Sequence, residues 1–121
     1  MSQTLESDRT LRPWGWFETL AEGPGYRVKR LLIHQGQRIS LQRHHHRSEH
    51  WVVVAGQGLM HLDGREWELA PGSTVLIAAQ AVHRASALLG DLELIEVQRG
   101  RELSEDDIER LADDFGRSVA G

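Results

Sequence analysis

The sequence predicts an all-β domain, either an antiparallel sandwich or a jelly-roll barrel, and three observations lead to this class. Short apolar and β-branched runs recur along the 121-residue chain. Turn residues separate these runs at close spacing, and the twelve glycines are spread along the chain. No repeat of about 20–50 residues is visible, so a solenoid is not expected. We therefore expect about eight to ten short strands in one domain.

The first strands follow a polar segment. Residues 1–11 are aperiodic, and we expect a flexible N-terminal segment there, followed by the folded domain at residues 12–121. Trp14 and Trp16 share a strand face, and Phe17 adds a third aromatic ring beside them. We expect these rings to cover one side of the barrel.

The remaining strands lie between turns that the residues specify. Proline and glycine favour turns at Glu22–Gly25 and at Pro71-Gly72, and Asp63-Gly64 is a strong signal for a two-residue hairpin. The expected strands are Tyr26–Ile33, Ile39–His44, His50–Ala55, Leu59–Leu62, Glu66–Leu69, Ser73–Ala78, Val82–Leu88 and Leu92–Val97.

A short amphipathic α-helix is expected after the strands, from Ser104 to Gly116. Ser104 is a favourable N-cap, and the three acids that follow it suit the first turn of a helix. Apolar residues then recur at helical spacing, at Ile108, Leu111, Ala112 and Phe115. This face would pack against the barrel or against a second subunit.

Composition excludes several classes of function. The net charge of −4 argues against nucleic acid as a partner, and no apolar run reaches the roughly 20 residues of a membrane span. The polar N-terminus does not resemble a signal peptide, and there is no cysteine. We expect a cytoplasmic protein without disulfides, in which histidine, carboxylate or amide groups bind any metal.

One stretch, Gln42–Trp51, carries four of the seven histidines. Residues two apart on a strand point to the same face, so Gln42 and His44 can face one cavity, and Glu49 can reach it from the next strand. An amide oxygen, an imidazole nitrogen and a carboxylate suit a divalent cation. The alternative is a polar, solvent-facing connection that is rich in histidine.

The spacing of these residues resembles that of the cupin superfamily. Its first motif matches five positions (Gly36, Gln42-x-His44, Glu49 and Gly56), and its second matches Gly72 and His83. The resemblance implies a cupin barrel with a metal site made of Gln42, His44, Glu49 and His83. It implies one divalent transition metal, with Zn as the first choice and Mn, Fe, Co or Ni as alternatives.

A narrower resemblance covers residues 12–116. The matching segments are Arg12–Gly15, Val28–Leu31, Ser40–Arg47, Glu49–Val54, Leu94–Gln98 and Glu105–Leu111. They are similar to the C-terminal cupin domain of type II phosphomannose isomerases, bifunctional enzymes that are also mannose-1-phosphate guanylyltransferases. The sequence has no Gly-rich nucleotide loop, so we do not expect guanylyl transfer from this chain alone.

This resemblance implies a metal-dependent isomerase that interconverts mannose 6-phosphate and fructose 6-phosphate through an enediol. A metal would stabilise the developing negative charge. Catalytic roles would fall to Arg47, Lys29 and His46, whereas Arg47, Arg84 and Arg30 would bind the phosphate, for which guanidinium groups are well shaped.

Two alternatives to the isomerase stay open. One is a non-catalytic cupin that binds a sugar phosphate or serves in regulation, and the other is a different metal reaction such as oxygenation with iron. Basic residues beside the metal motif favour the isomerase and the sugar-phosphate-binding cupin over the oxygenase, with a phosphorylated hexose as the partner. We also expect a homodimer, because the face of Trp14, Trp16 and Phe17 is larger than a small monomer should expose.

Overall fold

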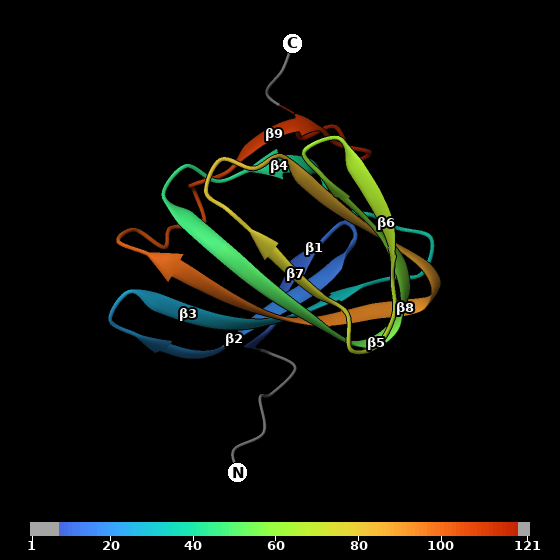
Figure 1. Cartoon of the computed structure of the whole chain (residues 1–121), viewed down its shortest axis with the longest axis horizontal. Helices are drawn as coiled ribbons and strands as arrows, with labels where there is room; N and C mark the ends of the chain where they lie inside the picture. Colours follow the sequence, from blue (N-terminus) through green and yellow to red (C-terminus); the bar gives the residue numbers. More distant parts are fainter. Residues whose placement is uncertain (1–7, 119–121) are drawn as a thin grey trace.

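The computed structural model describes residues 8–118 (Figure 1). These residues contain nine β-strands and no α-helix. The expected all-β barrel is therefore confirmed. Residues 1–7, most of the N-terminal segment expected to be flexible, lie outside the described residues. The strands are β1 (Thr10–Arg12), β2 (Gly15–Gly23), β3 (Tyr26–Ile33), β4 (Leu41–Arg43), β5 (Arg47–Leu62), β6 (Arg65–Leu69), β7 (Thr74–Ile77), β8 (His83–Gly100) and β9 (Glu109–Ala112).

Two long strands, β5 and β8, hold the barrel together. They pair antiparallel along their whole lengths, from Arg47 opposite Gly100 to Leu62 opposite His83. On its other side β8 pairs with β3, while β5 pairs with β7 through its first part and with β6 through its last part. Figure 1 shows the resulting sheet curled around a central space, with β4 and β9 together at one end.

Glycine permits the bend in β5. The pairing of β5 with β8 shifts register between Val53 and Gly58. Gly56 lies within this stretch with a φ of +84°, and a Cβ atom there would lie 2.1 Å from the carbonyl oxygen of Asp91. Only glycine fits such a position, so the bend that carries β5 from one side of the barrel to the other depends on it.

The apolar core fills the barrel and includes the N-terminal aromatic residues. Trp14, Trp16 and Phe17 are only 6%, 8% and 9% exposed within this single chain. The expected homodimer rested on an exposed face of these rings, and that premise is wrong because the chain itself covers all three. Trp14 and Phe17 belong to the core, and Arg9 and Arg30 lie over the ring of Trp16. The oligomeric state stays a prediction without this support.

The predicted helix from Ser104 to Gly116 is wrong. Ser104 does cap a turn, because its Oγ accepts a hydrogen bond from the amide of Asp106. The chain then extends, because the Asp107 carboxylate accepts bonds from the amides of His45 and His46, and β9 pairs with β4. These long-range hydrogen bonds outweigh the local helical preference. No helix in the described residues is long and apolar enough to cross a membrane.

Candidate metal centre

Three potential metal ligands meet inside the barrel: His44 after β4, Glu49 in β5 and His83 at the start of β8. Strand pairing brings them together, since Gln42 lies opposite His83 and β5 is hydrogen-bonded to β8. One ligand atom from each of the three residues lies within 4.8 Å of the other two. All three side chains are buried, with at most 3% of each residue exposed.

Both imidazole rings turn the same nitrogen toward Glu49. The Nδ1 atom of His44 lies 2.7 Å from the carbonyl oxygen of Asp107, and Nδ1 of His83 lies 3.0 Å from that of Ala81. A carbonyl oxygen only accepts hydrogen bonds, so Nδ1 carries the proton in each ring and Nε2 keeps its lone pair. The Nε2 atoms lie 3.2 and 3.8 Å from the two carboxylate oxygens of Glu49.

Burial keeps these rings neutral. It lowers the pKa of His44 to about 4, with the positive charge of Arg47 as the next cause, and it also lowers the pKa of His83. Two unprotonated nitrogens thus face a buried carboxylate, and the Nε2 atom of His83 has no hydrogen-bond partner within residues 8–118. Two imidazole nitrogens and a carboxylate oxygen in this arrangement fit a divalent cation.

The carboxylate of Glu49 is held by two further side chains. Arg47 donates from Nε to one oxygen at 2.8 Å, and Trp51 donates from Nε1 to the other at 3.1 Å. Arg47 is itself buried and donates from Nη1 to the carbonyl oxygen of Ser104. Partners of this kind fix the orientation of a ligand.

Gln42, the fourth predicted ligand, lies beside the cluster, and its amide nitrogen points toward His44. This nitrogen is 3.3 Å from Nε2 of His44, while the amide oxygen accepts a hydrogen bond from Ser40. The amide would have to turn over to offer its oxygen to a cation. Its role as a ligand stays a prediction.

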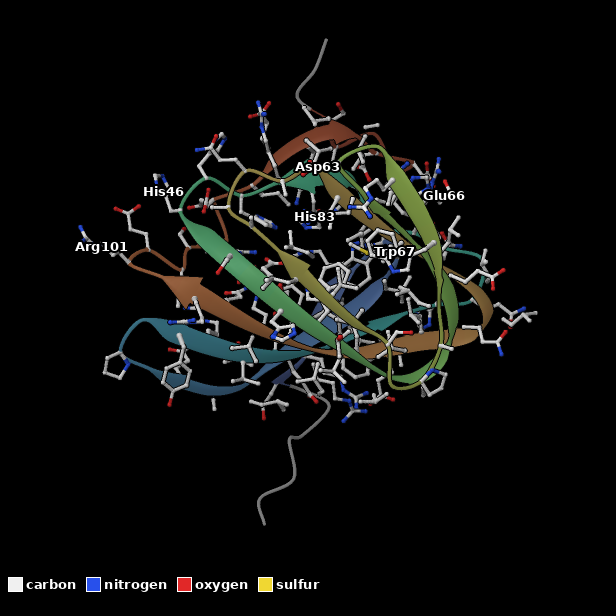
Figure 2. The ribbon with its side chains drawn as sticks, in the orientation of Figure 1. His46, Asp63, Glu66, Trp67, His83 and Arg101 are labelled. Carbon is white, nitrogen blue, oxygen red and sulfur yellow. The ribbon has the colours of Figure 1, made fainter. Side chains whose placement is uncertain are left out.

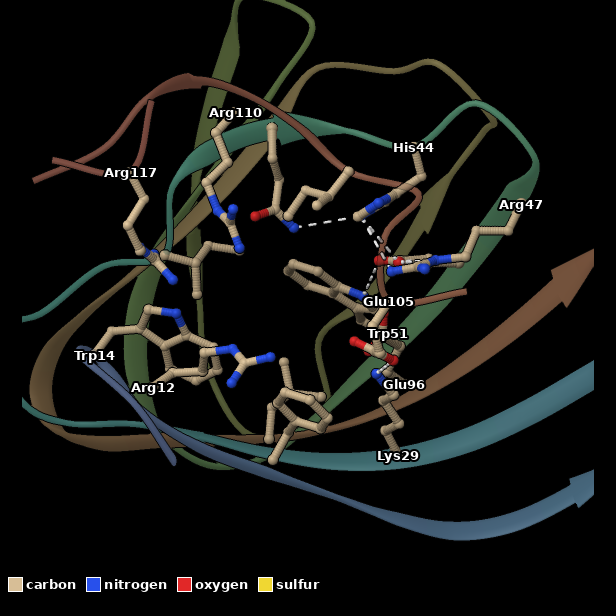
Figure 3. A pocket seen from close by; sticks show the side chains of 16 residues that line it. Arg12, Trp14, Lys29, His44, Arg47, Trp51, Glu96, Glu105, Arg110 and Arg117 are labelled. Atoms are coloured by element: carbon tan, nitrogen blue, oxygen red, sulfur yellow. Dashed lines mark hydrogen bonds and ion pairs between the residues drawn. The ribbon is translucent and has the colours of Figure 1, made fainter. Parts of the chain in front are cut away.

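A pocket opens beside the three ligands (Figure 3). His44, Arg47, Lys29 and Glu96 lie on one side, and Glu49 and Gln42 also line the pocket. Arginines that come from other segments line the opposite side, around Trp14.

Glu96 is a pocket residue that the sequence reasoning missed. It is 3% exposed, and burial together with the negative charge of Glu49 raises its pKa to about 8. The signal was present in β8, where Leu92 and Leu94 point inward with Glu96 in the same phase. Strand alternation therefore places this carboxyl group inside the barrel.

Of the residues expected to act on substrate, Arg47 and Lys29 line the pocket. Lys29 is buried and forms an ion pair with Glu105. His46 does not reach the pocket, because the turn after β4 leaves its side chain 58% exposed at the periphery, whereas His83 points into the barrel (Figure 2). A catalytic role for His46 finds no support in this placement.

Two predicted phosphate ligands are also misplaced. Arg30 lies outside the pocket, where it forms ion pairs with Glu18 and Glu93. Arg84 is buried between backbone carbonyls and donates hydrogen bonds to those of Ile39 and Ala112. Neighbouring positions along a strand face opposite sides of the sheet, which is why nearness in sequence to Lys29 and His83 misled the prediction.

The barrel and the buried ligand cluster together define a cupin with a candidate metal site. A family model described as "Mannose-6-phosphate isomerase C-terminal" matches residues 2–113. The chain belongs to this family.

The chain is similar to parts of larger proteins. It is 42% identical over 119 residues to the alginate biosynthesis protein AlgA of Pseudomonas aeruginosa, covering 98% of this chain and 25% of that protein. It is also 42% identical over 107 residues to the mannose-1-phosphate guanylyltransferase of Escherichia coli strain K12, covering 88% and 22%. The chain thus spans about a quarter of the length of the curated relatives it matches.

Solved structures share the fold. The capsular polysaccharide assembling protein CapF of Staphylococcus aureus has a TM-score of 0.76 at 18% identity, covering 86% of this chain and 34% of that one. KdgF from Halomonas sp. has a TM-score of 0.73 at 21% identity, covering 88% and 97%. The cupin domain of Schizosaccharomyces pombe Cnp3 has a TM-score of 0.69 at 10% identity, covering 75% and 68%.

The relatives correct the expected activity. They are named for alginate biosynthesis and for guanylyl transfer to mannose 1-phosphate, and not for isomerisation. The assignment as a mannose 6-phosphate isomerase is therefore wrong, and the catalytic roles given to Arg47, Lys29 and His46 lose their basis with it.

Proposed function

We propose that this chain is a metal-binding cupin domain whose pocket binds a phosphorylated mannose-type sugar, as part of an enzyme that handles mannose phosphates. The observation that carries the proposal is the convergence of His44, Glu49 and His83 at one side of a pocket that is rich in basic side chains. The name of the guanylyltransferase relatives supports mannose 1-phosphate as the first ligand to test, and the family description supports mannose 6-phosphate as the second.

The ligand cluster has a defined task in this proposal. The Nε2 atoms of His44 and His83 and an oxygen of Glu49 would hold one divalent cation, with Gln42 as a fourth ligand once its amide has turned. A nitrogen- and oxygen-only set of this kind suits Zn, Mn, Fe, Co or Ni. When bound, the cation supplies positive charge that attracts and polarises sugar oxygens.

Other pocket residues would orient the sugar. In the metal-free pocket, burial and the negative charge of Glu49 raise the pKa of Glu96 to about 8, and its carboxyl group can donate or accept a hydrogen bond with a sugar hydroxyl according to its protonation. Lys29 and Glu105, which pair across the pocket wall, offer a donor and an acceptor. Trp14 contributes an apolar surface on the opposite side.

The test is metal loading followed by calorimetric titration. The chelated protein is reloaded with each candidate metal, its metal content is measured by elemental analysis, and mannose 1-phosphate, mannose 6-phosphate and unphosphorylated mannose are titrated separately. We expect one equivalent of metal, binding of a mannose phosphate, and the loss of both in His83→Ala. A loaded protein that binds neither sugar phosphate would overturn the proposal.

A further inference from the structure

We propose that Arg12 and Arg110, assisted by Arg117, form a phosphate-binding subsite on the side of the pocket opposite the metal ligands. This inference rests on the proposed function, since it assigns the phosphate group of the sugar to particular side chains. It replaces the sequence-based choice of Arg47, Arg84 and Arg30.

Three separate segments bring these arginines together. Arg12 ends β1, Arg110 lies in β9, and Arg117 follows β9. All three line the pocket that also contains the metal ligands. Figure 3 shows them around Trp14, across the pocket from His44.

Two of these cations have no carboxylate partner in the described part of the chain. The side chain of Arg12 donates only to the carbonyl oxygen of Leu11 and lies over the ring of Phe17. Arg110 makes no ion pair with any of residues 8–118, and its Nε atom is buried there without a hydrogen-bond partner. Arg117 is different, because it binds the carboxylate of Asp113 at 2.8 and 3.0 Å.

The cations at this side also repel one another. Burial lowers the pKa of Arg110, and the positive charges of Arg117 and Arg12 lower it further, against the opposite effect of Asp113. A partly desolvated guanidinium group without a counter-ion is unfavourable, and an anion bound between the arginines would compensate its charge.

The chemistry of the subsite favours a phosphate monoester. Its charge of roughly −1.5 to −2 near neutral pH matches two unpaired guanidinium groups. Its oxygens accept the paired N–H bonds that arginine offers in a planar fork. A neutral hydroxyl group would leave both charges uncompensated, so we expect the subsite to discriminate strongly against unphosphorylated sugars.

The experiment compares Arg110→Gln and Arg12→Gln with a control, Arg65→Gln. Arg65 is exposed at the start of β6 and lies outside the pocket. Mannose 1-phosphate, mannose 6-phosphate and inorganic phosphate are titrated into each metal-loaded protein by calorimetry. We expect at least about tenfold weaker binding of the sugar phosphate in both pocket variants, no change in the control, and unchanged metal content in all three.

The outcomes separate this inference from the proposed function. If the parent protein binds a sugar phosphate and both pocket variants bind it equally well, the subsite is wrong and the proposed function stands. If the parent binds inorganic phosphate in an Arg110-dependent way but no sugar phosphate, the subsite is supported and the proposed function fails. Circular dichroism and thermal unfolding check each fold, and Arg12→Gln carries the test if Arg110→Gln does not fold.

Discussion

The two sides of the pocket differ in whether their basic side chains are paired with carboxylates. On the metal side Arg47 is bound to Glu49 and Lys29 is paired with Glu105, so each cation has a carboxylate partner. On the arginine side, Arg12 and Arg110 have no such partner within residues 8–118. The difference teaches that basic residues in one pocket need not share one task.

Removing a paired cation and removing an unpaired one should change the free energy of unfolding differently. Breaking a buried pair leaves an uncompensated charge and destabilises the fold, whereas removing an unpaired cation takes away a charge that the folded state already tolerates poorly. The charged residues on the metal side therefore contribute to the stability of the fold as well as to the candidate metal site. Arg12 and Arg110 are available to an anion because no carboxylate of residues 8–118 forms an ion pair with either of them. Variants of both sides can test this contrast.

The largest effect is expected for Glu49→Ala. The change removes the carboxylate ligand and leaves Arg47 and the indole N–H of Trp51 without their acceptor. We expect loss of bound metal by elemental analysis and a fall of about 3–5 kcal/mol in the free energy of unfolding of the metal-free protein in urea. Glu66→Ala, at an exposed ion pair with His61, is the control and should change the free energy by less than about 1 kcal/mol. Full metal content in Glu49→Ala would remove Glu49 from the ligand set.

Arg47→Gln and Arg110→Gln compare the two sides directly. Arg47→Gln should cost about 3–5 kcal/mol of unfolding free energy in the metal-free protein, because Glu49 stays buried without its cation. Arg110→Gln should cost nothing or stabilise the ligand-free protein, because it relieves repulsion with Arg117 and Arg12. Equal destabilisation by the two changes in urea titrations would show that the contrast between the sides is wrong.

A pH effect of intermediate size is expected from Glu96. Its pKa is about 8 in the folded protein and near its ordinary value of 4.5 when unfolded, so the folded state binds more protons between these values. Stability should therefore fall as pH rises, by about 2 kcal/mol between pH 6.5 and 8 at roughly 1.4 kcal/mol per pKa unit. Urea unfolding of the metal-free protein at several pH values measures this.

Glu96→Gln provides the check on that pH effect. In this variant the free energy of unfolding should no longer fall as the pH rises above 6.5. The variant should instead expose the opposite trend below that pH, where His44, with its lowered pKa, makes stability fall as pH decreases. A decline above pH 6.5 that persists in Glu96→Gln would assign it to another group.

The smallest effect is expected for Asp107→Ala. The Asp107 carboxylate accepts hydrogen bonds from the amides of His45 and His46 at 2.8 and 2.9 Å, next to the ligand His44. These bonds are partly exposed, so their loss should cost about 1–2 kcal/mol and weaken metal binding only modestly. Asp106→Ala, whose side chain makes no such contact, is the matched control. A metal titration in which both variants behave alike would show that the turn is held by other contacts.

Local patterns predicted the parts of the molecule that local chemistry determines. Alternation and turn residues predicted the strands, and Asp63 and Gly64 form the expected hairpin with φ values of +48° and +81°. The spacing of His44, Glu49 and His83 predicted a cluster that the barrel indeed brings together. These features depend on positions within one strand or turn, or on a spacing that the resemblance supplied.

Features that depend on partners far away in the sequence could not be predicted in this way. The segment after Ser104 has helical periodicity, but hydrogen bonds to the turn after β4 and pairing with β4 make it a strand. The same long-range pairing places Arg110 in the pocket, whereas the segment Glu105–Leu111, although it resembles the family, predicted no role for this residue. Nearness in sequence favoured Arg84 and Arg30 instead, because it does not reveal which side of the sheet a residue faces.

The hydrogen bond from His44 to Asp107 has a consequence for how the domain is made. These residues are 63 positions apart, and the Asp107 carbonyl fixes which nitrogen of His44 carries the proton. A ribosome releases the chain from its N-terminus, so both histidines and Glu49 emerge well before Asp107 does. Glu49 and His83 have their orienting partners nearby in sequence, whereas the orientation of His44 is completed only when the segment before β9 docks.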